Sequence, residues 1–198
     1  MCIRDSSKLL ADNFRKLEAH AAEQGKRPTV RGKRIMIERA NGFQGLKALL
    51  PPPSRRGLVL IDPPYEDKTD YRSVVQTVSD ALTRFATGTY AVWYPVLNRL
   101  ESRQMPDKLK RLSANGWLNV TLSVTTPSPD GFGLHSSGMF VHNPPWTLEP
   151  MLRELMPYLV KTLGGDEGAG FTLESGQTVA TNTCLLYTSP SPRDQRGS

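Results

Sequence analysis

An acidic residue, two prolines and an aromatic residue in succession, Asp62-Pro63-Pro64-Tyr65, form the pattern in this sequence that points most directly to chemistry. The pattern follows the apolar run 58–61, so we expect the carboxylate at the end of a buried strand. Proline fixes φ and donates no backbone hydrogen bond, which leaves the nearby carbonyls as outward-facing acceptors. Asp62 and such a carbonyl could accept both hydrogens of an exocyclic amine while Tyr65 stacks on the ring that bears it. The same four residues also suit a plain turn whose carboxylate caps a helix, and by themselves they do not separate the two interpretations.

A second segment of similar shape, Asn143-Pro144-Pro145-Trp146, also follows an apolar strand. An asparagine can serve in an amine-binding pattern as well. This segment, however, follows the strand of a predicted antiparallel pair, away from the point where ligands bind in open α/β sheets. We therefore interpret it as a structural turn that begins the last helix.

Helical and strand patterns alternate along the chain and predict an α/β fold with a mostly parallel sheet. Apolar residues at helical spacing predict helices over 9–23, 43–50, 71–85, 100–112 and 148–163. Apolar or alternating runs predict strands over 35–37, 58–61, 90–94, 118–124 and 139–141. The last two strands are joined without a helix, so we expect them to form an antiparallel pair at one edge. Asn41-Gly42 and Trp93-Tyr94-Pro95 also follow strands, and core packing is the expected role of Trp93 and Tyr94.

The composition is that of a globular chain with a positive charge. The 198 residues include 25 Lys and Arg against 19 Asp and Glu, a net charge of +6, and 38% are hydrophobic. These values exclude a disordered tail, a collagen or a coiled coil, and no apolar run approaches the ~18 residues of a membrane span. The charge favours a polyanionic partner, whereas each basic cluster is individually expected to be a solvated face. The three histidines (His20, His135 and His142) have no ligand spacing, so we expect no metal site.

The two ends of the chain have matching coding sequences. Cys184–Ser189 can be encoded by DNA whose complementary strand encodes Met1–Ser6. A sequencing adapter left on both ends of a DNA fragment would produce this relationship. We therefore expect residues 1–6 and 184–198 to be adapter-derived and residues 7–183 to be native. Both cysteines then lie outside the native part, so we expect neither a disulfide nor thiolate chemistry.

Longer stretches of the sequence resemble one protein family, in the same order and over nearly all of residues 7–183. They contain the Asp-Pro-Pro-Tyr pattern with its preceding strand and the Asn-Gly pair. The stretches are Arg39–Lys47, Ser54–Glu66, Lys68–Tyr71, Arg84–Pro95 and Ser137–Trp146. Together they resemble the bacterial ribosomal RNA large subunit methyltransferase J family.

The resemblance implies a class I, Rossmann-like methyltransferase fold with S-adenosylmethionine (S-adenosyl-L-methionine) as cofactor. The implied reaction is methylation of the N6 amino group of one adenine in 23S ribosomal RNA. Asp62 would be catalytic and would also border the cofactor. Asn41 and Gly42 lie where the family has an Asp-Gly pair beside the cofactor adenine, and the loss of the acid weakens that contact. The substrate base would be bound by Pro63, Pro64 and Tyr65.

The family's glycine-containing loop, its ribose-binding acid, its upstream histidines and its helical insertion are all expected before Ser7. Residues 7–183 therefore resemble the carboxyl-side portion of a methyltransferase domain that lacks its amino-terminal part. The expected partner is 23S ribosomal RNA, either protein-free or as an early precursor. The protein is expected to be a cytoplasmic monomer that binds neither a metal ion nor a membrane. Two alternatives stay open, namely an amino-methylating enzyme for DNA or a protein amide, and a non-catalytic RNA-binding module.

Overall fold

The computed structural model describes residue 16 and residues 40–112, 115–128 and 133–177. The chain divides after Leu49 into two units, which are described separately. In the first unit, helix α2 (Gly42–Leu49) begins at Asn41, whose Oδ1 accepts hydrogen bonds from the backbone N–H groups of Phe43 (3.0 Å) and Gln44 (3.3 Å). Such side-chain bonds satisfy the free N–H groups at the start of a helix, and the helix predicted over 43–50 is confirmed. The predictions over 9–23 and 35–37 lie outside the described residues.

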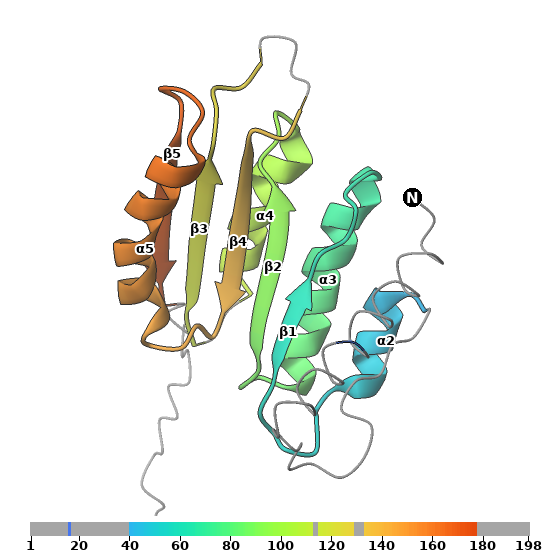
Figure 1. Cartoon of the computed structure of the whole chain (residues 1–198). Coiled ribbons are helices and arrows are strands. Elements are labelled where there is room, and N and C mark those ends of the chain that lie inside the picture. Colours follow the sequence, from blue (N-terminus) through green and yellow to red (C-terminus); the bar gives the residue numbers. More distant parts are fainter. Residues whose placement is uncertain (1–15, 17–39, 113–114, 129–132, 178–198) are drawn as a thin grey trace, which may run out of the picture. The chain divides into compact units, whose positions relative to one another are not determined.

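The second unit holds the sheet, as Figure 1 shows. Its helices are α3 (Lys68–Arg84), α4 (Leu100–Lys110) and α5 (Leu148–Leu163). Its strands are β1 (Leu58–Ile61), β2 (Thr89–Pro95), β3 (Trp117–Ser123), β4 (Ser136–His142) and β5 (Gly170–Gly176). The strands lie in the order β1-β2-β4-β3-β5. The predicted α/β class is confirmed, and no helix within the described residues is long and apolar enough to cross a membrane.

Strand pairing follows the length of each connection. β1 and β2 are parallel because α3 connects them by a crossover. β3 and β4 are joined by a loop without a helix and pair antiparallel, which confirms that prediction. This pair lies inside the sheet rather than at its edge, because β4 also pairs with β2 and β3 also pairs with β5. Parallel pairing is therefore confined to β1 and β2 among the described strands. β5 was not predicted, since glycines at both ends weaken its strand pattern.

Helices α3 and α4 cover one face of the sheet and α5 covers the other (Figure 1). The stripe predicted over 71–85 packs inward, and two of its three valines, Val74 and Val78, are fully buried. Alternate residues of β2 face the same side, where the Tyr90 hydroxyl shares its one proton between the carbonyls of Ala81 (2.9 Å) and Phe85 (2.7 Å). These bonds fix α3 against β2, and they thereby set the position of the β1–α3 turn.

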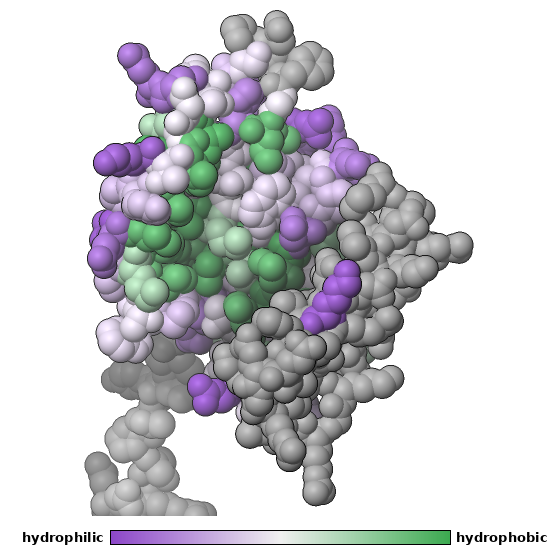
Figure 2. All heavy atoms as spheres, viewed as in Figure 1, coloured by the Kyte–Doolittle hydropathy of each residue, from purple (hydrophilic) through white to green (hydrophobic). Residues whose placement is uncertain are grey.

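The face that carries α5 is only partly covered, and hydrophobic side chains lie open on it (Figure 2). Met156 of α5 packs on Leu118 and Val120 of β3. Leu58 and Leu60 of β1 are 70% and 63% exposed. The prediction that the run 58–61 is buried on both faces was therefore wrong. The physical reason is that β1 lies at the opposite edge of this sheet from the strands that α5 covers.

Candidate active site

Asp62 follows the last residue of β1, and its carboxylate is exposed. Within the described part of the chain it forms no ion pair. Helix α3 begins six residues later and has its own cap, because Asp67 Oδ1 accepts the Thr69 N–H at 2.8 Å. That hydrogen bond lowers the pKa of Asp67. The helix-capping interpretation of Asp62 is thus contradicted, since the capping carboxylate is Asp67, and Asp62 is left available to a ligand.

Tyr65 fixes the shape of the turn. Its φ is +54°, a left-handed conformation that is strained for a bulky residue. The hydroxyl donates a 2.7 Å hydrogen bond to the Trp93 carbonyl, and the ring packs against Tyr71 with a centroid separation of 4.7 Å. Burial raises the pKa of Tyr65, and the charges of Tyr71 and Asp62 act in the same direction. The hydroxyl therefore stays protonated and continues to donate, which holds the turn in one conformation.

The four residues of the turn differ in exposure. Asp62 and Pro64 are exposed, Pro63 is half-buried, and only 3% of Tyr65 is exposed. No open face of the Tyr65 ring is presented to a base in this arrangement, because Tyr71 and Trp93 pack around it. The base-stacking role of Tyr65 and the substrate-binding roles of Pro63 and Pro64 stay predictions.

Asn41 and Gly42 belong to the other unit, so their distance from Asp62 is not defined. The Asn41 side-chain oxygen accepts two backbone hydrogen bonds, which occupy both of its lone pairs. The Nδ2 group is what this side chain could offer to a ligand without losing the cap. A Cβ added at Gly42 would meet no heavy atom of the described part of the chain within 4 Å. The cofactor-binding role of this pair stays a prediction.

The Asn143-Pro144-Pro145-Trp146 segment is a structural turn, as predicted. Asn143 has a φ of +50°, and its Nδ2 donates to the carbonyls of Ala86 (2.8 Å) and Gly88 (2.7 Å). Because β4 runs antiparallel to β2, the segment lies at the opposite end of the sheet from Asp62 (Figure 1). The Asn143 side-chain amide therefore connects the turn after β4 to the loop between α3 and β2.

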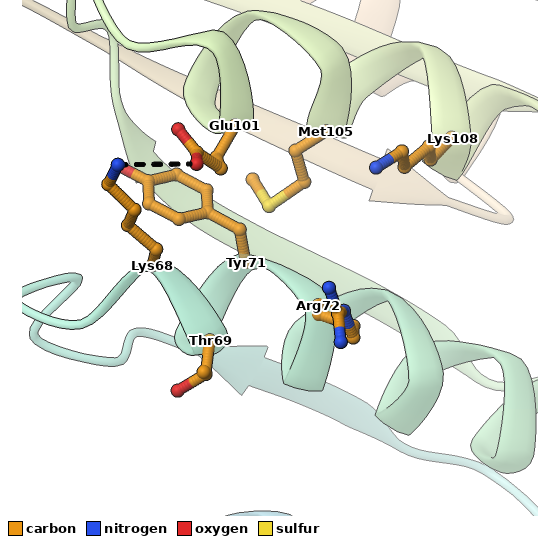
Figure 3. A pocket seen from close by; sticks show the side chains of 7 residues that line it. All are labelled: Lys68, Thr69, Tyr71, Arg72, Glu101, Met105 and Lys108. Atoms are coloured by element: carbon orange, nitrogen blue, oxygen red, sulfur yellow. Dashed lines mark ion pairs between the residues drawn. The ribbon is translucent and has the colours of Figure 1, made fainter.

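A hollow between α3 and α4 was missed by sequence reasoning (Figure 3). It is lined in part by Lys68, Arg72 and Lys108. The signal that could have found it is the i,i+4 spacing of Lys68 and Arg72, which places both side chains on one face of the helix. The sequence also has basic clusters over 26–34 and 108–111, and the residues of the first lie outside the described ones. Lys110 is engaged with Glu174 at 2.8 Å.

No group of three or more His, Cys, Asp or Glu side chains in the described ranges could hold a metal ion. His142 is buried at 0% exposure, and His135 Nδ1 lies 3.0 Å from Thr125 Oγ1.

An α/β sheet with an available aspartate and two prolines at a strand end is compatible with a methyltransferase, and comparison with known proteins supports that class. A family profile described as "Ribosomal RNA large subunit methyltransferase D, RlmJ" matches residues 5–174. The chain belongs to this family of ribosomal RNA large subunit methyltransferases.

Two curated relatives carry the name ribosomal RNA large subunit methyltransferase J. The Haemophilus influenzae protein is 47% identical over 142 residues, 72% of this chain and 50% of its own length. The Escherichia coli K12 protein is 49% identical over 126 residues, 64% of this chain and 45% of its own length. The crystal structure of protein LPL1258 from Legionella pneumophila has a TM-score of 0.65 and 32% identity, and covers 76% of this chain and 55% of that one. The chain thus spans about half the length of the curated relatives it matches.

Proposed function

We propose that the protein to which this chain belongs methylates the N6 amino group of an adenine in 23S ribosomal RNA, with S-adenosylmethionine as methyl donor. The observation that carries the proposal is the carboxylate of Asp62, which is exposed, at the end of β1, and not used as a helix cap. Family membership supports the same reaction. In this proposal the protein is a monomer that acts in the bacterial cytoplasm, and its substrate is protein-free or early precursor ribosomal RNA.

An adenine amino group is a poor nucleophile, because its lone pair is delocalised into the ring. Asp62 would accept one of its hydrogens and a carbonyl of the Pro63–Pro64 turn the other. Two acceptors favour a tetrahedral nitrogen and stabilise the positive charge that develops on it. A single group placed where charge develops can contribute about 10²–10³ in rate. The fixed Tyr65–Trp93 hydrogen bond keeps these acceptors in position.

The residues present fit the expected cofactor in chemistry. An exposed carboxylate such as that of Asp62 suits a donor that carries positive charge, and the open space around Gly42 admits a ligand close to the backbone. S-adenosylmethionine supplies an electrophilic methyl group when bound. Asp62, Asn41 and Gly42 are the residues that would hold it, with Asn41 offering its Nδ2 group.

Residues 7–183 are proposed as the carboxyl-side portion of the methyltransferase domain, with adapter-derived residues 1–6 and 184–198 at its ends. The experiment therefore uses an extended version of the chain. In the extended version the corresponding upstream part of the Escherichia coli relative precedes residue 7.

The test is incubation of the extended version with methyl-labelled S-adenosylmethionine and, in separate reactions, protein-free 23S ribosomal RNA, DNA and protein. We expect label in the ribosomal RNA, recovered as N6-methyladenine after digestion to nucleosides. Label in DNA or protein instead would replace the proposal with the corresponding amino-methylating enzyme. No label in any substrate, with RNA binding retained, would favour a non-catalytic RNA-binding module.

A further inference from the structure

The hollow between α3 and α4 collects positive charge in a small volume of about 280 Å³. Lys68 and Arg72 reach it from α3 and Lys108 from α4, and among the described residues that line it Glu101 is the one carboxylate (Figure 3). The volume lies just below the ~300–1,000 Å³ of pockets that take drug-sized ligands. The hollow therefore suits a small anion better than a whole nucleoside cofactor.

Tyr71 brings an unused hydrogen-bond donor to this hollow. Its side chain is 3% exposed, and its hydroxyl forms no hydrogen bond of normal geometry with any of the described residues. Ser102 is a nearby polar group whose interaction with the hydroxyl acts to lower the pKa of Tyr71, but its oxygen already donates to the Pro95 carbonyl at 2.7 Å and accepts the Leu97 N–H at 3.1 Å. In Figure 3 the Tyr71 ring extends toward the end of the hollow where Lys68 and Glu101 meet. A buried donor without an acceptor is costly, and an anion in the hollow would remove that cost.

The contact that covers this end of the hollow is loose. Lys68 Nζ lies 3.8 Å from Glu101 Oε1, and 72% of the Lys68 side chain is exposed. An ion pair this exposed contributes little stability. Lys68 can therefore turn from the carboxylate to an incoming anion at small cost and uncover the Tyr71 hydroxyl.

The hollow and the Asp62 turn share a wall. The rings of Tyr65 and Tyr71 contact each other at 4.7 Å, and Lys68 is six residues from Asp62 along the chain. A nucleotide whose base reaches Asp62 would have its own or a neighbouring phosphate within reach of the cations on α3.

We propose that the α3–α4 hollow binds a backbone phosphate of the RNA next to the target base, through Lys68, Arg72 and Lys108 and a hydrogen bond from Tyr71. The inference rests on the proposed function for the identity of the strand. It adds a phosphate contact that orients the RNA relative to Asp62. Phosphate contacts position a nucleic acid without reading its sequence.

The test measures binding of a fluorescent single-stranded oligoribonucleotide to the full chain by anisotropy over a range of salt concentrations. Arg72→Gln and Lys108→Gln should each weaken binding about three- to tenfold at low salt. Each should also reduce the slope of log K against log salt by about 0.7. Lys161→Gln, which removes one exposed charge from α5, is the matched control and should change neither quantity.

Tyr71→Phe separates a binding role from a structural one. Because the hydroxyl forms no hydrogen bond of normal geometry within the described ranges, the variant should keep the urea midpoint of the wild type. It should nevertheless bind the oligoribonucleotide several-fold more weakly. A lowered midpoint with unchanged RNA affinity would assign the hydroxyl to folding and overturn its place in the site.

The phosphate site is overturned if Arg72→Gln and Lys108→Gln bind like the wild type, or if Lys161→Gln weakens binding as much as they do. Its failure differs from that of the proposed function, because the binding assay needs no methyl transfer. If no substrate is methylated and the three variants still differ as expected, the reaction is refuted and the phosphate site stands.

Discussion

His142 should make the stability of this fold sensitive to mild acid. The residue is 0% exposed, and neither ring nitrogen has a hydrogen-bond partner among the described residues. Its register partners are Tyr90 on one side and Trp117 on the other, and its ring lies 4.9 Å from that of Phe140. Burial lowers the pKa of His142 from 6.5 to about 4. The folded chain therefore holds a neutral imidazole at a pH where the unfolded chain holds a protonated one.

The sign follows from proton binding in the two states. Between pH 6.5 and about 4 the unfolded state binds more protons at this residue, so the free energy of unfolding falls as the pH falls. The part of the free energy of unfolding that depends on a neutral His142 is fully present above pH 6.5 and is lost by about pH 4. A shift of this size corresponds to about 3 kcal/mol in total, of which about 2 kcal/mol is lost by pH 5.

The assay is urea unfolding of the wild type and of His142→Phe at pH 7.5 and pH 5, followed by tryptophan fluorescence. The variant has no group that titrates at this position, so its free energy of unfolding should fall by about 2 kcal/mol less over this interval. Contributions from the carboxylates cancel in the difference between the two proteins. His142→Leu serves as a second variant if phenylalanine packs poorly. Equal pH dependence of the wild type and both variants would refute the reasoning.

Two further substitutions test side-chain contacts within the second unit, one between β4 and Tyr94 and one in the Asp62–Tyr65 turn. Gly138→Ala would place a Cβ inside the ring of Tyr94, its register partner, so we expect a loss of about 1–3 kcal/mol in the free energy of unfolding. Gly170→Ala, where an added Cβ meets no atom within 4 Å, is the control, and equal effects of the two would contradict the packing. Tyr65→Phe removes the 2.7 Å hydrogen bond to the Trp93 carbonyl, which should cost about 1 kcal/mol in urea unfolding and slow methyl transfer by the extended version. Unchanged stability and rate would show that this bond does not hold the turn.

Periodicity in the sequence was sufficient to locate most elements of the second unit. The stripe over 71–85 became α3, and the alternation over 118–124 became β3, because each pattern reports one buried face. β5 was missed because the alternation of Phe171 and Leu173 with polar residues is short and has a glycine at each end of the strand. The exposure of β1 could not be predicted either, since an apolar run does not reveal which of its faces another element covers.

The candidate site was only partly predictable. The sequence located Asp62 at a strand end, but it left a helix-capping role open, and the bond from Thr69 to Asp67 removes that role. The expected stacking of the Tyr65 ring on a base stays a prediction, and the sequence did not indicate that the hydroxyl donates to the Trp93 carbonyl and that the ring packs on Tyr71. The cations of the α3–α4 hollow come from two helices, and a single helix pattern cannot show that Lys108 faces Lys68 and Arg72.

The most direct test of the central claim is the single-turnover rate of methyl transfer to protein-free 23S ribosomal RNA by the extended version carrying Asp62→Ala. We expect the rate to fall by at least about 10²–10³, with the circular dichroism spectrum and urea midpoint of the parent retained, because Asp62 is exposed. Glu66→Gln, an exposed carboxylate four residues away, is the matched control and should keep the parent rate. A near-parental rate for Asp62→Ala would contradict the account.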